Sequence, residues 1–233
     1  MTRTNEYPQT TGVLAIWHDI EADGDMAHEI FEWYNREHHI ERFEVPGFVR
    51  ARRYEALEGS PRIFSRYDTT TPEVLSSDAY LQRVNNPSQW TQRTMPHYRN
   101  MSRTVCEIVQ RFGRGEGGKV ATLRIDPTSG TENDLVTWIR DRAIPDLIKA
   151  PGIIGGQLLA AAPDANSAGS AEKNIRGDAD AHCPLALLVT GSSFQAVKDG
   201  CEGFVKPDSP LACGANVALG VYELVFDLST LDD

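Results

Sequence analysis

The chain has 233 residues, of which 40% are hydrophobic, and a formal net charge of -10. This length accommodates one large domain or two of about 100 to 120 residues each, with enough apolar side chains for a real core. The acidic balance argues against a nucleic-acid surface or an anionic membrane as partner, because both need clustered Lys and Arg.

Targeting and redox features favour a cytoplasmic protein. Residues 1–25 lack the basic start and apolar core of a signal peptide, and no run approaches the ~20 apolar residues of a membrane span. The four cysteines have no CxxC spacing. We therefore expect reduced and mostly buried thiols.

Hydrophobic periodicity predicts the order β-α-β-β-α-β in the first half of the chain. A polar arm (1–11) precedes the first strand. The first helix starts near Asp25 and ends before Pro46-Gly47, because the residue preceding a proline disfavours helix. The segment 85–101 is interpreted as a long loop with aromatic anchors. The other expected elements are strands at 12–20, 48–56, 62–67 and 103–112 and a helix at 71–84.

The second half repeats this order after a glycine-rich linker. The Ala/Asp/Ser/Gly-rich segment 163–182 predicts a loop. The predicted organisation is a first unit at 1–113, a linker at 114–118 and a second unit at 119–233. The expected elements are strands at 119–125, 153–162, 185–190 and 215–226 and helices at 132–148 and 193–201.

Three identities in matching helix-break-strand contexts indicate an internal duplication. Each pair is separated by 105 residues, as 138 minus 33 gives for the tryptophans. In the same register His38 falls opposite Ala143, and Arg52 falls opposite Gln157. Polar residues of the first half are thus absent from the second, so function is expected in the first half. The matched pairs are Trp33 and Trp138, Pro46 and Pro151, and Gly47 and Gly152.

The segment 33–54, WYNREHHIERFEVPGFVRARRY, resembles the pattern of EthD-like and related members of the dimeric α+β barrel superfamily. In that pattern a helix carrying Glu-His leads into Pro-Gly-Phe and a basic strand. The resemblance implies an α+β fold of two tandem ferredoxin-like β-α-β-β-α-β units, joined within one chain as a pseudo-dimeric barrel. It leaves the reaction open, since members include lactone isomerases, polyketide cyclases, dehydratase-like enzymes, cofactor-free oxygenases and haem proteins.

The predicted first helix carries two adjacent histidines. At about 100° per residue, Tyr34 and Glu37 lie within its broad apolar face, His38 lies on the flank, and His39 points toward solvent. A buried carboxylate at Glu37 is costly unless it is paired or protonated. His38 is either an acid–base group, which the resemblance favours, or a structural histidine at a helix end, where the dipole stabilises its cation.

The strand after Pro46-Gly47 places Arg50, Arg52 and Tyr54 on one face. In the fold that the chain resembles, this face looks into the barrel, where a guanidinium could hold a carboxylate or an enolate oxygen. Ordinary exposed or ion-paired arginines are the alternative. The helix lies on the other side of the sheet, so its histidine could reach such a cavity only around the barrel mouth.

Six further residues are weaker candidates. Trp17 and His18 point to opposite faces of the first strand, and His18 could line the cavity as a general base or stand at the edge of the core. The residues that could roof an aromatic pocket or anchor the long loop are Tyr67, Trp90, His97 and Tyr98. No ligand spacing such as HExxH supports a metal site, and GRGEGG lacks the context of a phosphate-binding loop.

The leading hypothesis is a cofactor-independent acid–base enzyme of lyase, isomerase or cyclase type. Its substrate would be a small hydrophobic aromatic or lactone-like carbonyl compound of catabolism or secondary metabolism. A non-catalytic small-molecule-binding or accessory protein and a cofactor-free oxygenase are the alternatives, and a homodimer is left open. The expected catalytic residues are His38, His18, Arg52 and Tyr54, and the expected substrate-binding residues are Arg50, Trp17, Tyr34, Glu37, Tyr67 and Trp90.

Overall fold

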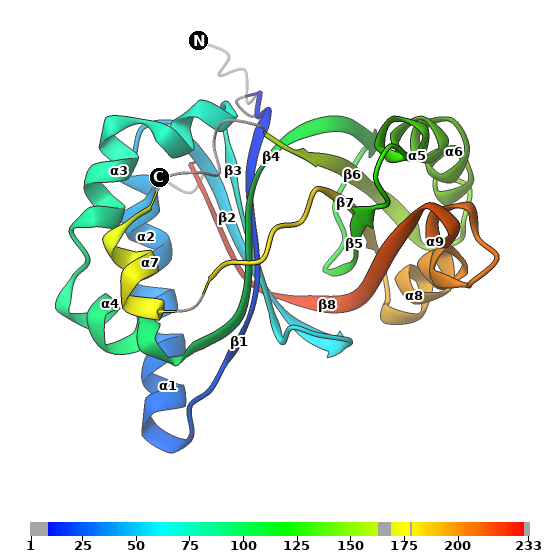
Figure 1. Ribbon diagram of the computed structural model, residues 1–233. Helices are drawn as coiled ribbons and strands as arrows, with labels where there is room; N and C mark the ends of the chain where they lie inside the picture. Colours follow the sequence, from blue (N-terminus) through cyan, green and yellow to red (C-terminus); the bar gives the residue numbers. More distant parts are fainter. Residues whose placement is uncertain (1–8, 163–168, 178, 231–233) are drawn as a thin grey trace, which may run out of the picture.

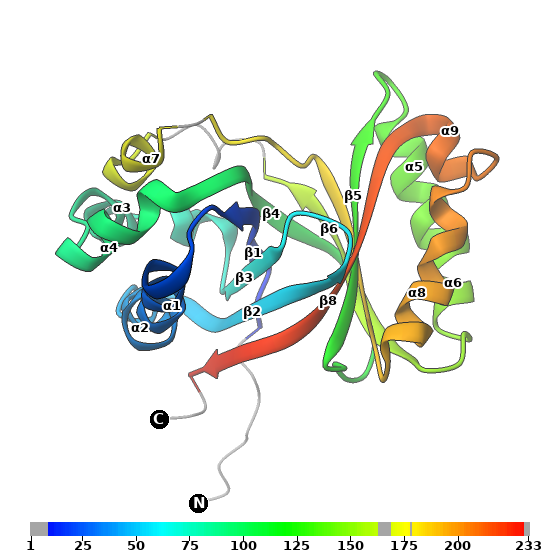
Figure 2. The same ribbon diagram turned by 90° about the horizontal axis from the view of Figure 1, so that it is seen from below.

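The computed structural model describes residues 9–162, 169–177 and 179–230. Eight strands form a closed barrel in the order β1-β3-β2-β8-β5-β7-β6-β4, and every neighbouring pair is antiparallel (Figure 2). The chain is therefore an α+β protein built around one barrel. The strands are β1 (Gly12–Ile20), β2 (Phe48–Glu58), β3 (Ile63–Thr69), β4 (Tyr98–Gly113), β5 (Lys119–Pro127), β6 (Ile153–Ala161), β7 (Leu185–Gly191) and β8 (Ala215–Ser229).

Helices cover the outside of the barrel in two groups, one for each half of the chain (Figure 1). The first-half strands lie together as β2-β3-β1-β4, the second-half strands as β8-β5-β7-β6, and the two sets meet where β2 pairs with β8 and β4 with β6. The first group contains α1 (Gly24–Trp33), the π-helical turn η1 (Tyr34–His38), α2 (His39–Phe43), η2 (Pro72–Ser76), α3 (Asp78–Asn85), α4 (Gln89–Thr94) and η3 (Met95–His97). The second contains α5 (Glu132–Trp138), the π-helical turn η4 (Ile139–Ala143), α6 (Ile144–Leu147), α8 (Phe194–Glu202), η5 (Gly203–Val205) and α9 (Pro210–Gly214).

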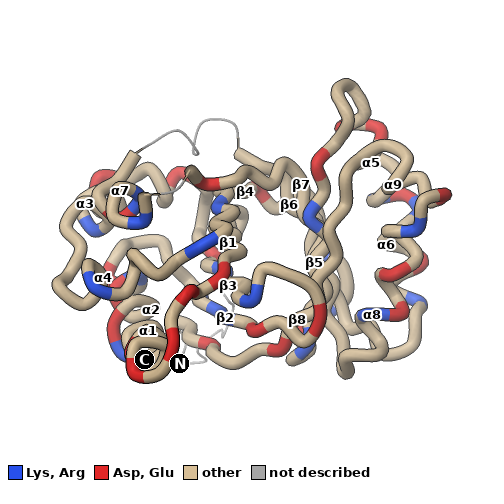
Figure 3. The backbone as a smooth tube through the Cα atoms, turned by 60° about the horizontal axis from the view of Figure 1, so that its bottom comes forward, with Lys and Arg blue, Asp and Glu red and all other residues tan. Residues whose placement is uncertain are grey.

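Basic and acidic residues are interspersed along the backbone of both halves (Figure 3). Within the described ranges, none of the helices combines the length and the apolar character needed to cross a membrane.

The interior of the barrel is filled by apolar side chains. Because side chains alternate along a strand, Trp17 of β1 points inward while its neighbours His18 and Ile16 point to the outer face. Trp17 stacks on Phe64 at 4.7 Å between ring centroids. Every strand contributes to this packing. The buried residues of the cluster are Val13, Ala15, Trp17, Tyr54, Phe64, Cys106, Val120, Leu159, Cys183, Ala186, Leu188 and Tyr222.

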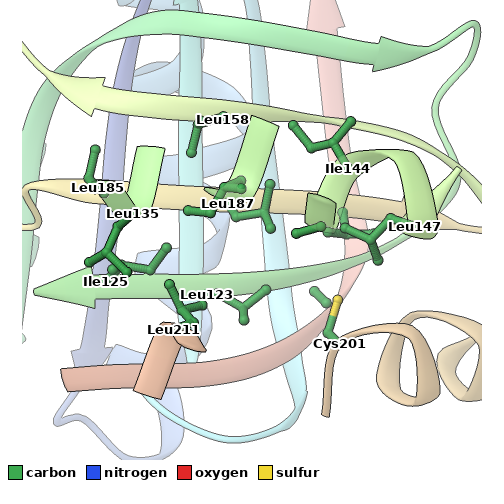
Figure 4. Close-up of a cluster of buried hydrophobic side chains, with 14 of the residues drawn as sticks. Leu123, Ile125, Leu135, Ile144, Leu147, Leu158, Leu185, Leu187, Cys201 and Leu211 are labelled. Atoms are coloured by element: carbon green, nitrogen blue, oxygen red, sulfur yellow. The ribbon is translucent and has the colours of Figure 1, made fainter. Parts of the chain in front are cut away.

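A second apolar cluster fills the space between the second-half helices and the outer face of their strands (Figure 4). Leucine and isoleucine side chains from α5, α6 and α9 meet those of β5, β6 and β7, and each fully buried one contributes about 1.5–3 kcal/mol. Ala143 lies within this cluster. The second half therefore has a closed hydrophobic layer where the first half carries histidine.

The two Pro-Gly breaks have a common physical cause. Gly47 and Gly152 have φ values of +100° and +78°, which favour glycine. A Cβ atom on Gly47 would lie 2.6 Å from Val74, and one on Gly152 would lie 2.6 Å from Ala196. Both glycines thus allow a sharp turn and a close approach of the following helix.

Each half also has a π-helical turn at the same place, Tyr34–His38 and Ile139–Ala143. The offset is 105 residues (139 minus 34), the offset between Trp33 and Trp138. In such a turn each N–H bonds to the carbonyl five residues back, which adds one residue to the turn. The added residue rotates the following side chains by about 100° relative to a continuous α-helix.

Two segments predicted as loops contain helices. The segment 85–101 includes α4, whose N-cap Ser88 accepts a hydrogen bond from the backbone N–H of Thr91. The segment 163–182 includes α7 (Ala171–Arg176), which Ser170 caps in the same way. Residues 163–168 and 178 lie outside the described residues. Although α7 lies in the connection between β6 and β7, it packs against α3, α4 and η3 of the first half (Figure 1).

A network of buried charges lies at one end of the barrel. Asp68 accepts hydrogen bonds from Arg52 and Arg66, Glu116 also binds Arg52, and Gln157 accepts from Arg66 at 2.8 Å. Burial alone would raise the pKa of Asp68, but the two guanidinium groups outweigh burial and lower this pKa to about 2. Asp68 is thus the carboxylate that compensates two buried cations.

We expect Asp68→Asn to lower the free energy of unfolding in urea by about 3 kcal/mol or more, because it removes the carboxylate that compensates the buried guanidinium of Arg66. Asp227→Asn is the matched control, since Asp227 pairs with the more exposed Arg50. Its effect should stay below about 1 kcal/mol. Equal losses for both variants would contradict a special role of the buried network.

Candidate functional site

A small polar cavity lies in the first half, between the helices and the outer face of the sheet. We call it the His38 cavity, and its volume is about 40 Å³. Histidine, tyrosine and arginine side chains converge on it from helices and strands. Its lining residues are Leu14, Ile16, Tyr34, His38, Arg42, Ser65, Tyr67, Tyr80, Met95, Tyr98, Met101, Arg103, Glu172 and Arg176.

A chain of hydrogen bonds leads from this cavity to His18. The Tyr98 hydroxyl donates to the Tyr34 hydroxyl, and Tyr34 is 2.8 Å from Nε2 of His18. Nδ1 of His18 lies 3.1 Å from the carbonyl oxygen of Asp19 and therefore carries the proton. Nε2 is then the acceptor for Tyr34. The groups form a relay of fixed polarity, Tyr98 to Tyr34 to His18.

Burial keeps every member of this relay neutral at pH 7. Desolvation lowers the pKa of His18 to about 4 and raises the pKa of Tyr34 to about 12. It also raises the pKa of Tyr98 well above its usual value. A neutral imidazole at the end of a chain of hydroxyls can accept a proton that enters at the cavity.

His38 and His39 are both buried, because the π-helical turn that ends at His38 rotates the side chains that follow it. The ring of His38 lies 4.2 Å from the ring of Trp33, and its Nδ1 lies 3.5 Å from a guanidinium nitrogen of Arg42. Burial, followed by the charge of Arg42, lowers the pKa of His38 well below its usual value. His38 is therefore a neutral imidazole in the cavity.

The prediction that His39 points to solvent is wrong. Its Nδ1 lies 2.9 Å from the hydroxyl of Tyr67, and its ring stacks on Phe226 at 4.6 Å. The 100° per residue used in the prediction assumes a continuous α-helix. Because the π-helical turn contains one extra residue, the helix is not continuous and the 100° rotation does not hold across it.

Helix α7 closes the cavity with a carboxylate. Both oxygens of Glu172 lie 2.8 Å from one terminal nitrogen of Arg42, and both side chains are buried. On the far side of Glu172 lies a second cavity, the α7 cavity, of about 130 Å³. The two cavities share four lining residues, Tyr80, Arg103, Glu172 and Arg176.

The predicted site residues divide between the two sides of the sheet. His18, His38, Tyr34 and Tyr67 meet in or beside the His38 cavity on the helix side. Of the two places expected for His18, the barrel interior is wrong, because its side chain lies on the opposite face of β1 from Trp17 and stacks on Tyr98.

The other predicted residues lie apart from this cavity. Trp17 and Tyr54 are packed in the apolar interior of the barrel, and Arg52 and Arg50 belong to ion pairs at its end. Arg50 and Arg52 line a pocket of about 330 Å³ at this end together with Asp68 and Glu116, whereas Tyr54 is packed in the aromatic core and does not line it. Glu37 accepts a hydrogen bond from Nε1 of Trp33 at 3.1 Å, and Trp90 packs against the cluster that contains Trp33.

Sequence reasoning missed Arg42, Ser65 and Glu172. Arg42 follows His38 by four residues, a spacing that puts both on one face of a helix and could have been noticed. Ser65 is on the return strand, next to inward-facing Phe64. Glu172 comes from a segment 130 residues from Arg42. Only the fold brings it to the cavity.

The cavity does not fit haem or a metal centre as it stands. Sites for cofactors have volumes of about 300–1,000 Å³, whereas the His38 cavity measures about 40 Å³. In the corresponding place of the second half, Ala143 is packed among apolar residues. Among the described residues, no group of three or more His, Cys, Asp or Glu side chains has the arrangement to hold a metal ion.

No family model matches the sequence, and neither does any curated protein. Solved structures share its fold over nearly the whole length. An anthrone oxidase-like protein is 12% identical with a TM-score of 0.59, covering 95% of this chain and 93% of the other. A chlorite dismutase variant from Candidatus Nitrospira defluvii is 8% identical with a TM-score of 0.53, covering 96% and 95%. A haem-binding protein from Thermus thermophilus is 8% identical with a TM-score of 0.50, covering 94% and 92%.

These neighbours are proteins of the ferredoxin-like, dimeric α+β barrel type, and the chain shares their fold. At such identities the likeness concerns the fold alone and does not transfer an activity or a ligand.

The buried histidines make stability depend on pH. Native His18, with its pKa lowered from 6.5 to about 4, binds fewer protons than the unfolded chain between these values. Stability therefore falls as the pH falls through this window, by about 3 kcal/mol for His18. We expect urea unfolding of His18→Gln to show a shallower dependence on pH between about 6.5 and about 4 than the wild-type protein. His28→Gln, at an exposed position, should keep the wild-type slope, and a wild-type slope for His18→Gln would contradict this account.

Proposed function

We propose that the chain is an enzyme that moves a proton on a small aromatic carbonyl compound without an organic cofactor. The observation that carries this proposal is the Tyr98–Tyr34–His18 relay, whose two tyrosines line a cavity together with His38 and Arg42. Structural packing alone would be served by apolar side chains, as in the second half, where Ala143 takes the place of His38. Buried polar groups are costly unless they are hydrogen-bonded, and a cluster of buried titratable groups at a cavity is typical of a functional site.

In the proposed step, the carbon–hydrogen bond next to the substrate carbonyl breaks. Its electron pair moves into an enolate, and the proton goes to the oxygen of Tyr34 while Tyr34 passes its own proton to Nε2 of His18. The enolate oxygen accepts a hydrogen bond from the ring of His38, in a site where the charge of Arg42 favours an anion. Return of the proton to a different carbon gives isomerisation, and departure of a β-substituent gives elimination.

In this proposal the substrate enters through the α7 cavity. The His38 cavity alone is too small for an aromatic ring, since a cavity that binds benzene measures about 150 Å³. Displacement of the side chains shared by the His38 and α7 cavities would join the two spaces. Leu75 and Val84 then supply an apolar wall for a ring.

A cofactor-free oxygenase is the second candidate. One structural neighbour is an anthrone oxidase-like protein, and anthrone is an aromatic carbonyl compound. The first step of such an oxygenase would be the same deprotonation. The enolate would then react with dioxygen, and for anthrone the balanced outcome is anthraquinone and water. A non-catalytic binding protein is the third, and it needs the cavity but not the relay.

We also propose that the chain arose by duplication of an EthD-like unit, with units at 1–113 and 119–233 joined by 114–118. The coincident offsets of the π-helical turns and Pro-Gly breaks support this proposal. A chain of this kind acts as a pseudo-dimer in a cytoplasmic setting, and pairing of two such chains would be measured by light scattering.

The enzyme proposal predicts that Tyr34→Phe removes the relay and leaves the shape of the cavity. With 2-indanone in D₂O, we expect the wild-type protein to accelerate hydrogen–deuterium exchange at the acidic carbons, as measured by NMR. Tyr34→Phe should slow the protein-dependent exchange by about 100-fold or more, while 2-indanone still quenches tryptophan fluorescence with unchanged affinity.

Tyr222→Phe is the matched control. Tyr222 is a buried tyrosine of the barrel interior, and its hydroxyl donates to the carbonyl oxygen of Pro61. This variant should keep the wild-type exchange rate. Saturable binding of 2-indanone without any accelerated exchange would replace the enzyme by a binding protein. If the wild-type protein consumes dioxygen in the presence of anthrone and Tyr34→Phe does not, the result would favour the oxygenase.

A further inference from the structure

The ion pair between Arg42 and Glu172 uses only part of the guanidinium group. Both carboxylate oxygens share one terminal nitrogen of Arg42. The other terminal nitrogen is buried and has no hydrogen-bond partner within the part of the chain that the structure describes. A carboxylate in the best geometry engages two guanidinium nitrogens in parallel. Arg42 therefore offers a better carboxylate site than Glu172 fills.

Glu172 stands where a ligand that spans both cavities would pass. It lines the His38 cavity and the α7 cavity, and its partner Arg42 lines only the first. The α7 cavity, at about 130 Å³, approaches the size that holds a benzene ring, about 150 Å³. A ring in this space can direct a substituent toward Arg42 only when the side chain of Glu172 moves aside.

The charges around this point favour an anion once Glu172 has moved. Arg42, Arg103 and Arg176 line the cavities, and Arg103 donates to the hydroxyl of Tyr80 at 3.0 Å. Arg176 is paired with Asp180 at 2.7 and 2.9 Å. Withdrawal of Glu172 thus leaves three guanidinium groups lining the cavities, with the carboxylate of Asp180 on Arg176 and that of Glu41 near Arg42.

We propose that the ligand of this cleft is an aromatic carboxylate, whose carboxylate group displaces Glu172 and binds Arg42. Glu172 then acts as an internal competitor, and α7 is the cover that the ligand lifts. This inference rests on the proposed function for the location of the site and deepens it by naming the class of substrate. Because the displaced group and the ligand group are chemically alike, the exchange costs little electrostatic energy.

Glu172→Gln tests the competition directly, with benzoate and its neutral isostere benzamide as probes. By isothermal titration calorimetry we expect benzoate to bind this variant about tenfold more tightly than the wild-type protein, or better. The affinity for benzamide should not change. Glu44→Gln is the matched control, because Glu44 pairs with Arg83 at the surface and lines neither cavity. It should leave the affinity for benzoate as in the wild-type protein.

Two further measurements keep the test independent of the folding of one variant. Arg42→Met combined with Glu172→Leu replaces the buried pair by apolar groups, a change that proteins commonly tolerate, and this protein should lose the preference for benzoate over benzamide. In the wild-type protein, saturating benzoate should increase amide hydrogen exchange in α7, and benzamide should not.

Equal benzoate affinities in Glu172→Gln and wild-type protein, or an equal gain for benzamide, would overturn the inference, as would unchanged exchange in α7 with benzoate bound. These outcomes are separate from the enzyme test. A gain in benzoate affinity without proton exchange on 2-indanone would retain the carboxylate site and remove the enzyme. Tyr34-dependent proton exchange on 2-indanone without a gain in benzoate affinity would retain the enzyme and remove the carboxylate site.

Discussion

The packing of aromatic side chains inside the barrel is the constraint on which the rest of the molecule depends. Trp17, Tyr54, Phe64 and Tyr222 occupy the space that a wider barrel would leave for a ligand. Interiors are packed as densely as organic crystals, so a ligand could enter here only by unfolding the core. The pockets accordingly lie at the end of the barrel, where Arg50, Arg52 and Asp68 line one, and on the outer faces of the sheet. There the two halves differ, because one layer is wholly apolar and the other contains histidines, tyrosines and arginines.

The π-helical turn decides which groups this outer layer can use. A continuous α-helix through Tyr34–His38 would send one of the two histidines to water. With the extra residue, His38 reaches the cavity and His39 reaches Tyr67 beneath the helix. Such turns are often found at functional sites. The second half has the same turn with Ile139 and Ala143 at its ends, so the backbone feature alone does not create a site. The residue types at its ends do.

Much of the fold could be predicted from the sequence, because local signals determined it. The Pro-Gly breaks, the alternation along the strand after Pro46-Gly47 and the repeated element order gave strand and helix positions that the structure confirms within a few residues. The site was harder. The sequence does not show which face of β1 or β2 is open to a ligand. That depends on whether the barrel interior is filled, and side chains from all eight strands fill it. The buried position of His39 could not be predicted without the π-helical turn, and the composition of Tyr34–His38 does not indicate such a turn. The position of Glu172 at the cavity depends on the path of the long β6–β7 connection, whose composition indicated a loop.

That path shows why joining two units in one chain matters for the cleft. A symmetric dimer of identical chains would repeat each cleft and each covering segment twice. On the proposed duplication, one half was free to replace its histidine by Ala143 and to close its outer layer with leucines. The connection between its second and third strands was free to lengthen and to carry α7 over the other half. The β2–β3 connection of the first half is much shorter and stays at the barrel. Arg42 and Glu172 are consequently a contact between residues of the two halves. In the proposed function, the half without a polar cleft therefore controls entry to the half that has one.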